Sequence, residues 1–107
     1  MLEHLKALCQ LNGISGREDA VQQYIIKQLE TWKLSYQVDP LGNILVKKDG
    51  QKPAKTKLMI SAHMDEVGGI VTYVHEDGTL QFEPVGGIQP SVVIGRQVVV
   101  GENPGLP

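Results

Sequence analysis

The sequence lacks the features that mark secreted, membrane-bound and disulfide-stabilised proteins. Its single cysteine, Cys9, cannot form an internal disulfide, which fits a reducing compartment. No apolar run approaches the roughly 20 residues that a membrane-spanning helix needs. The N-terminal residues include neither a basic segment nor a continuous apolar stretch, so they differ from a signal peptide. We therefore expect a cytoplasmic protein that does not bind membranes.

Aromatic residues are scarce, at 5% of the chain, and neither sign of charge is in excess. The 10 Lys and Arg and the 12 Asp and Glu are interspersed and give a formal net charge of −2. This balance argues against a nucleic-acid partner, because proteins that bind nucleic acid carry a basic patch. The 107 residues are 41% hydrophobic, which is typical of one globular unit of mixed α/β structure with its own core.

Two amphipathic helices are predicted in the first third of the chain. Apolar residues recur at three- and four-residue spacing over residues 2–11 and 17–32. Gly13 is suited to end the first helix, because glycine adopts the left-handed conformation at little cost. Ser15 and Glu18 have the spacing of a capping box, which predicts that Ser15 begins the second helix.

Patterns typical of strands follow the second helix. Alternation predicts a strand pair at residues 35–38 and 43–47, joined by a turn over residues 39–42. Residues 58–62 form an almost uniformly apolar run, as in a strand buried on both faces of a sheet. This first part of the chain therefore combines helices with a sheet.

The second part of the chain is predicted to be β structure only. An Asp-Gly pair at residues 77–78 predicts a hairpin between strands within residues 67–75 and 80–85. Two further strands are expected at residues 92–94 and 96–100.

A domain boundary is expected near Glu66 to Gly69, where the pattern changes. It separates residues 1–66 from residues 67–107. Residues 102–107 follow a predicted strand and look like a connection to another strand. Two interpretations of this end are open, a truncated β module and a loose C-terminal tail.

The sharpest candidate site is His63-x-Asp65-Glu66, directly after the apolar run 58–62. Polar residues at the carboxyl end of a buried strand lie where α/β proteins build their sites. Imidazole is the commonest metal ligand, and a nearby carboxylate can accept its second N–H and so fix its orientation. A metal site needs three or four ligands, and no second cluster is visible. On spacing alone, a structural histidine therefore stays the alternative.

The other polar or aromatic candidates are predicted to have no chemical role. We expect His4 and His75 to be solvated at the surface. Cys9 falls on the apolar face of the first helix and has no base beside it in the sequence. Tyr24 and Trp32 are expected in the core.

Four segments together resemble a known family. They are residues 13–18 (GISGRE), 39–43 (DPLGN), 61–68 (SAHMDEVG) and 84–88 (PVGGI). Their order and spacing resemble the N-terminal part of the M42 metallo-aminopeptidases, the glutamyl and deblocking aminopeptidase group. The resemblance extends over essentially all of the chain but over only the opening part of the family sequence.

The resemblance implies an α/β fold, the zinc-peptidase-like three-layer catalytic domain interrupted by an inserted β-rich domain used in oligomerisation. Residues 1–66 would open the catalytic domain, and residues 67–107 would be the truncated first part of the insertion. It also implies a homo-oligomer for the complete protein.

The resemblance further implies two-metal peptide hydrolysis, with zinc or cobalt as the divalent ions. His63 matches the first metal ligand of the family and Asp65 the catalytic carboxylate that orients it, whereas Glu66 matches without an assigned role. The remaining ligands and the general base would lie beyond Pro107. We therefore expect the complete protein to act on peptides and the 107-residue chain alone to be inactive.

Two other functions stay open. The chain could be a non-catalytic self-association module, or part of a related co-catalytic metallohydrolase that acts on another amide. Some family members carry an endoglucanase label, but carbohydrate hydrolysis needs two carboxylates flanking a cleft, and no such pair is identifiable in the sequence.

Overall fold

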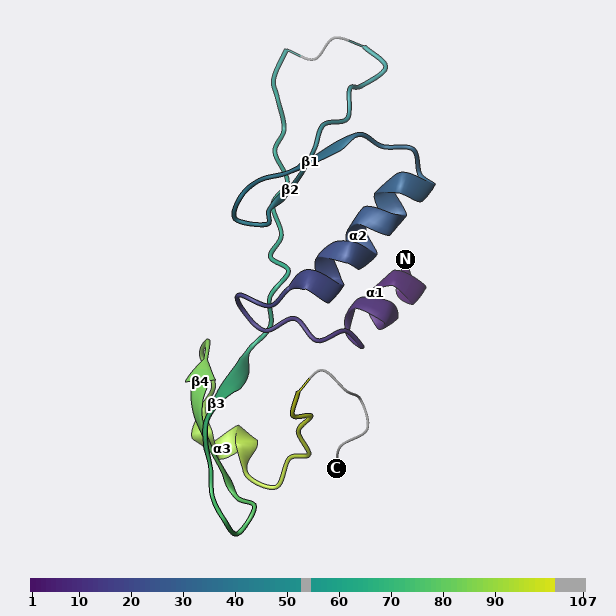
Figure 1. The fold of residues 1–107 in the computed structure, drawn as a ribbon. Coiled ribbons are helices and arrows are strands. Elements are labelled where there is room, and N and C mark those ends of the chain that lie inside the picture. The colour runs from purple at the N-terminus through teal and green to yellow at the C-terminus, as the bar shows by residue number, and fades with distance from the viewer. Residues whose placement is uncertain (53–54, 102–107) are drawn as a thin grey trace.

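The two predicted helices open the chain and lie side by side in the computed structural model, which describes residues 1–52 and 55–101 (Figure 1). Helix α1 spans Leu2–Leu8 and helix α2 spans Asp19–Thr31, so both are shorter than the sequence pattern predicted. The buried hydrophobic side chains of the described residues are Val21 and Leu29, both on α2. Trp32, expected in the core, is 56% exposed just after α2, so that prediction was wrong.

The capping box predicted for α2 is absent. Glu18, not Ser15, is the residue that precedes the helix, and no side chain caps its first turn. The Glu18 carboxylate instead accepts a hydrogen bond from the amide of Gly16 at 2.8 Å. Since Gly16 has a positive φ of 84°, the chain turns there, and α2 begins two residues later than expected.

Strands β1 (Tyr36–Val38) and β2 (Ile44–Val46) form an antiparallel pair, as predicted. Tyr36 lies opposite Val46. The pair lies beside α2 (Figure 1).

Strands β3 (Gly68–Val74) and β4 (Leu80–Val85) form the predicted hairpin, with a register shift between Val71 and Tyr73. Gly78 supplies the left-handed conformation of the turn, with a φ of 84°. The hairpin lies at the opposite end of the molecule from β1 and β2 (Figure 1).

The strands predicted after β4 are not formed. Residues 90–93 instead make the short helix α3 (Pro90–Val93), and residues 96–100 have no regular structure. Pro90 stands in the first turn of α3, where its fixed φ suits a helix and its missing N–H costs nothing. The segment 102–107, expected to be an inter-strand connection or a tail, lies outside the described residues.

The apolar run 58–62, predicted to be a buried strand, is also not a strand. Leu58, Met59 and Ile60 are each more than four-fifths exposed. A strand needs neighbours to take its backbone hydrogen bonds. Among the described residues, none of the four strands pairs with this segment.

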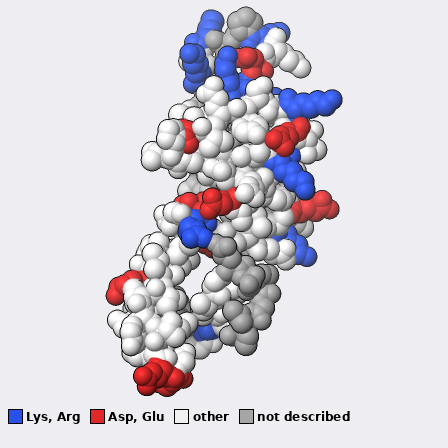
Figure 2. All heavy atoms as spheres, in the orientation of Figure 1, with Lys and Arg blue, Asp and Glu red and all other residues white. Residues whose placement is uncertain are grey.

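The described residues therefore form a mixed α and β structure with two separate two-stranded sheets. They extend over 64 × 28 × 25 Å and leave many large apolar side chains exposed. No helix among them has the length and hydrophobicity of a membrane span. Lysines gather around the loop after β2 and acidic residues at the turn of the β3–β4 hairpin on the face drawn in Figure 2.

Candidate functional site

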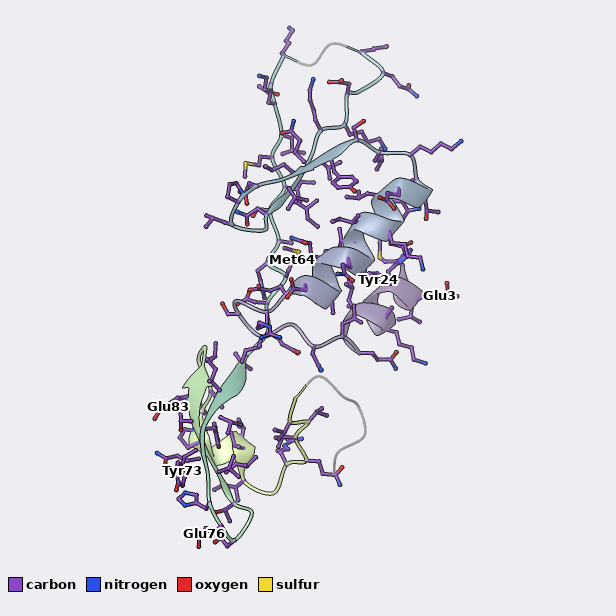
Figure 3. The ribbon with its side chains drawn as sticks, viewed as in Figure 1. Glu3, Tyr24, Met64, Tyr73, Glu76 and Glu83 are labelled. Atoms are coloured by element: carbon purple, nitrogen blue, oxygen red, sulfur yellow. The ribbon has the colours of Figure 1, made fainter. Side chains whose placement is uncertain are left out.

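Three of the four motif segments meet around one hollow of about 520 Å³. Its lining residues fall within the ranges 15–22, 40–43 and 62–65. Figure 3 shows Met64, from the last of these ranges, near the beginning of α2. The fourth segment, residues 84–88, does not contribute to the lining. The fold thus brings His63 and Asp65 together with two loops that are distant in sequence.

His63 is held by Asp65 through one ring nitrogen. The Nδ1 atom lies 3.0 Å from Oδ1 of Asp65 and 2.9 Å from its backbone carbonyl oxygen. Because a carboxylate and a carbonyl are both acceptors, Nδ1 carries the proton and donates. The lone pair of the ring is then on Nε2. The His63 side chain is 84% exposed, so it is available to a ligand from outside the described residues.

The loop between β1 and β2 is fixed by Asp39. Its Oδ1 atom accepts from the backbone amides of Leu41 and Asn43, each at 2.9 Å, and its Oδ2 atom accepts from Asn43 Nδ2 at 2.8 Å. These bonds, first of all the one from the Asn43 side chain, lower the pKa of Asp39 below its ordinary 3.8. An ionised Asp39 therefore gives one wall of the hollow a defined shape.

Gln22 joins this loop to α2. Its side-chain nitrogen donates to the carbonyl of Gly42 at 2.8 Å. Gly42 has a φ of 86°, and a Cβ atom there would lie 3.3 Å from the same Gln22 nitrogen. Glycine at position 42 therefore permits both the turn and the contact with α2.

Glu66 connects the third segment to the first. Its backbone amide donates to the carbonyl of Gly13 at 2.7 Å, and its carboxylate accepts from the Gly13 amide at 3.2 Å. Ile14 and Glu66 also form an isolated parallel bridge. The sequence offered no reason to assign Glu66 a role. Its partner, Gly13, lies 53 residues earlier, and no local pattern predicts such a distant contact.

The remaining histidines lie outside the hollow. His4 was expected to be solvated, but it is partly buried and its Nδ1 atom lies 2.8 Å from the hydroxyl of Tyr24. Its ring also meets Trp32 edge to face, with ring centres 5.7 Å apart. His75 is exposed on the hairpin, as predicted, and contacts the ring of Tyr73. Cys9, expected on an apolar face, is exposed at the end of α1.

The described residues supply part of a metal site at most. They contain no group of three or more His, Cys, Asp or Glu side chains arranged to hold an ion. An imidazole oriented by a carboxylate does fit one ligand position of such a centre. The other ligands of a metal ion would have to come from outside these residues.

A model of the family described as M42 glutamyl aminopeptidase matches residues 42–106. The chain belongs to this family. Over 97 residues it is 34% identical to a glutamyl aminopeptidase of Lactococcus lactis, covering 91% of this chain and 27% of the relative. It is 30% identical, also over 97 residues, to a lysyl aminopeptidase of Pyrococcus furiosus, covering 90% of this chain and 27% of that protein.

A solved crystal structure has a similar fold over most of this chain. It is a crystal structure described as an endoglucanase from Thermotoga maritima, with a TM-score of 0.72 and 40% sequence identity. The match covers 82% of this chain and 28% of the Thermotoga chain. The M42 chain described here thus spans less than a third of the length of these relatives.

Proposed function

We propose that this chain forms part of the active site of an aminopeptidase that uses two divalent metal ions to remove N-terminal residues from peptides. The observation that carries the proposal is the His63–Asp65 pair, in which Nδ1 is held by two acceptors and the lone pair is on Nε2. The pair lines the hollow where three family motifs meet. Its residue types and hydrogen bonding match an imidazole ligand with its orienting carboxylate.

In this proposal each residue of the pair has a separate task. Asp65 accepts the proton of His63 Nδ1, which fixes the tautomer and raises the basicity of Nε2. His63 then binds one ion through Nε2. The bound metal ions supply Lewis-acid polarisation of the peptide carbonyl and a lowered pKa for a bound water. Asp39 keeps the loop 40–43 in place as one side of the peptide-binding space.

The identity of the metal follows only in part from the ligands. An imidazole suits zinc and cobalt, the two ions we propose, and the other ligands decide between them. We further propose that residues 1–66 belong to a three-layer α/β catalytic domain and that residues 67–107 begin an inserted β-rich domain used in homo-oligomerisation. A cytoplasmic location is part of the same proposal.

Peptide hydrolysis is favoured over carbohydrate hydrolysis despite the name of the Thermotoga relative. Glycoside hydrolysis needs one carboxyl group to donate a proton and a second to act as base or nucleophile. In the hollow, the carboxylate of Glu18 accepts from the Gly16 amide and that of Asp65 from His63. Each of these two carboxylates already has a hydrogen-bond partner within the chain.

The proposal is tested with the product of the complete reading frame that encodes this chain. We expect it to release N-terminal residues from short peptides when zinc or cobalt is supplied. His63→Ala should lower kcat/KM by more than about 100-fold, since it removes a metal ligand. The matched control is His75→Ala, at an exposed histidine outside the hollow, which should leave the rate unchanged. Metal-independent activity, or full activity of His63→Ala, would contradict the proposal.

One observation favours a second function, a self-association module. Ile70, Tyr73 and Val74 of β3 are 57%, 58% and 62% exposed. Apolar strands left uncovered favour association with another chain. Self-association that is independent of metal, in a protein without peptidase activity, would favour this function over the first.

A further inference from the structure

Glu66 makes contacts that the proposed roles of His63 and Asp65 leave unexplained. It satisfies both backbone polar groups of Gly13, the carbonyl through its own amide and the amide through its carboxylate. Gly13 is buried, and a buried backbone amide needs an acceptor. Within the described residues, the Glu66 carboxylate is the acceptor found for this amide.

The contact is close as well as hydrogen-bonded. A Cβ atom at Gly13 would lie 2.9 Å from Val21 Cγ2 and 3.3 Å from the backbone oxygen of Met64. In the segment that contains Glu66, a Cβ atom at Gly68 would lie 2.8 Å from the Ile14 side chain. Residues 13–14 therefore pack closely against residues 64–68, with Gly13 and Gly68 at points where a side chain would not fit.

The contact adjoins the residue that holds His63. Asp65 directly precedes Glu66, and both its carbonyl oxygen and its carboxylate accept from His63 Nδ1. Ser15, Gly16 and Met64, which flank the contact, line the same hollow as His63. Both acceptors that fix the imidazole therefore belong to the residue next to Glu66.

We propose that Glu66 is the positioning residue for His63. Its carboxylate ties the buried Gly13 amide to the segment 63–66, and this tie keeps Asp65 in register with the imidazole. The inference rests on the proposed function in one respect: the positioning serves to present Nε2 to a metal ion. The positioning itself is a property of the chain without metal.

The contact requires the reach of the side chain more than its charge. The Gly13 amide is a neutral donor, so an amide oxygen at the same place can accept from it. Glu66→Gln keeps the length and an acceptor, whereas Glu66→Asp keeps the charge and loses one methylene of reach. The two variants therefore distinguish the effect of side-chain length from the effect of charge.

The test measures the tautomer of His63 by ¹⁵N NMR in the metal-free product of the complete reading frame, at about pH 8.5, where free imidazoles are uncharged. We expect the Nδ1–H tautomer to be dominant in this parent protein and in its Glu66→Gln variant. It should be lost to the Nε2–H form in Glu66→Ala and Glu66→Asp. The control is Glu76→Ala, at an exposed glutamate in the turn of the hairpin, which should match the parent chain.

A titration of the same variants with Zn²⁺ alone gives a second readout. Glu66→Ala and Glu66→Asp should weaken Zn²⁺ binding about tenfold, as the loss of a group that orients a ligand does, and Glu66→Gln should restore it. If Glu66→Ala does not fold, the comparison of Gln with Asp still decides the question.

The possible failures are distinguishable. An unchanged tautomer in Glu66→Ala, or loss of the tautomer in Glu66→Gln with retention in Glu66→Asp, overturns the positioning role. If instead the tautomer responds as expected but His63→Ala binds Zn²⁺ as well as the parent does, the positioning role is supported and the proposed metal-binding function fails.

Discussion

His63 and Asp65 are adjacent enough in sequence for their contact to be predicted, and the structure brings the pair together. What the sequence did not reveal is which other residues surround them. Glu18, Gln22 and Asn43 reach the same hollow only because the loops fold back on α2. Such neighbours depend on tertiary contacts between distant segments, for which a single sequence holds no periodic signal.

Asp65 should control how well His63 binds a metal ion. In Asp65→Asn the side-chain amide can donate to Nδ1, which favours the tautomer with its proton on Nε2. We expect Zn²⁺ affinity to fall by about 10- to 100-fold, measured by calorimetric titration of the product of the complete reading frame.

The matched control for this variant is Asp49→Asn. Asp49 is exposed and paired with Lys47 in the loop after β2, outside the lining of the hollow. Equal affinity of Asp65→Asn and the parent protein would show that Asp65 does not orient a ligand.

Gly13 should be sensitive to any side chain. Gly13→Ala places a Cβ atom 2.9 Å from Val21 Cγ2, one of the buried hydrophobic side chains. We expect a loss of about 1–3 kcal/mol in the free energy of unfolding, measured by urea denaturation. Gly87→Ala is the control, because nothing lies within 4 Å of its Cβ position. Equal losses in the two variants would contradict the close packing.

At the scale of elements, local signals predicted the local structure well. The pair β1–β2 and the hairpin β3–β4 were found because their turns carry residues with a conformational reason to be there, such as Gly78. The apolar run 58–62 and the segment 96–100, which ends in three valines, were misassigned as strands. An apolar run predicts burial, but a strand forms only where another strand pairs with it, and the described residues offer these two segments none.

The two turn aspartates should make their loops sensitive to acid. The pKa of Asp39 is lowered below 3.8 mainly by the hydrogen bond from the Asn43 side chain. The pKa of Asp77 is lowered below 3.8 mainly by the hydrogen bond from the Thr79 hydroxyl. A pKa that is lowered in the folded state stabilises the loop at a pH above the ordinary pKa. This contribution is lost as the pH falls through the pKa of the folded state. The acid transitions of the Asn43 and Thr79 amide resonances should therefore have midpoints below pH 3.8 in an NMR titration.

Each loop can serve as the control for the other. Asp39→Asn should remove the acid transition at Asn43 and leave that at Thr79 in place, because the two aspartates lie in separate turns. Transitions at or above the ordinary value would show that the hydrogen bonds to the carboxylates do not persist in solution.

At the scale of the whole molecule, the described residues are open and poor in core. Val21 and Leu29 are the buried hydrophobic residues among them, while Leu58 and Ile60 are exposed. Composition predicted a core of ordinary size, because it counts apolar residues without regard to what covers them. The exposed residues 58–60 come just before the segment that holds His63. Further protein structure packed against these residues would therefore also fix the segment of His63.

The 107-residue chain by itself should not hydrolyse peptides. One imidazole does not hold two metal ions in competition with water and buffer, and the described residues have no cluster of three ligand side chains. The check is release of amino acids from peptide amides by the purified chain, with zinc or cobalt added. Release that disappears in His63→Ala would show that the chain alone completes the site.

The role of His63 as a metal ligand is tested directly by the metal content of the complete reading-frame product, measured by mass spectrometry for the parent protein, His63→Ala and the control His75→Ala. We expect two divalent ions per chain in the parent and in His75→Ala, and a clear loss in His63→Ala. Unchanged metal content in His63→Ala, or a parent protein that takes up no divalent ion, would contradict the assignment of His63 as a ligand.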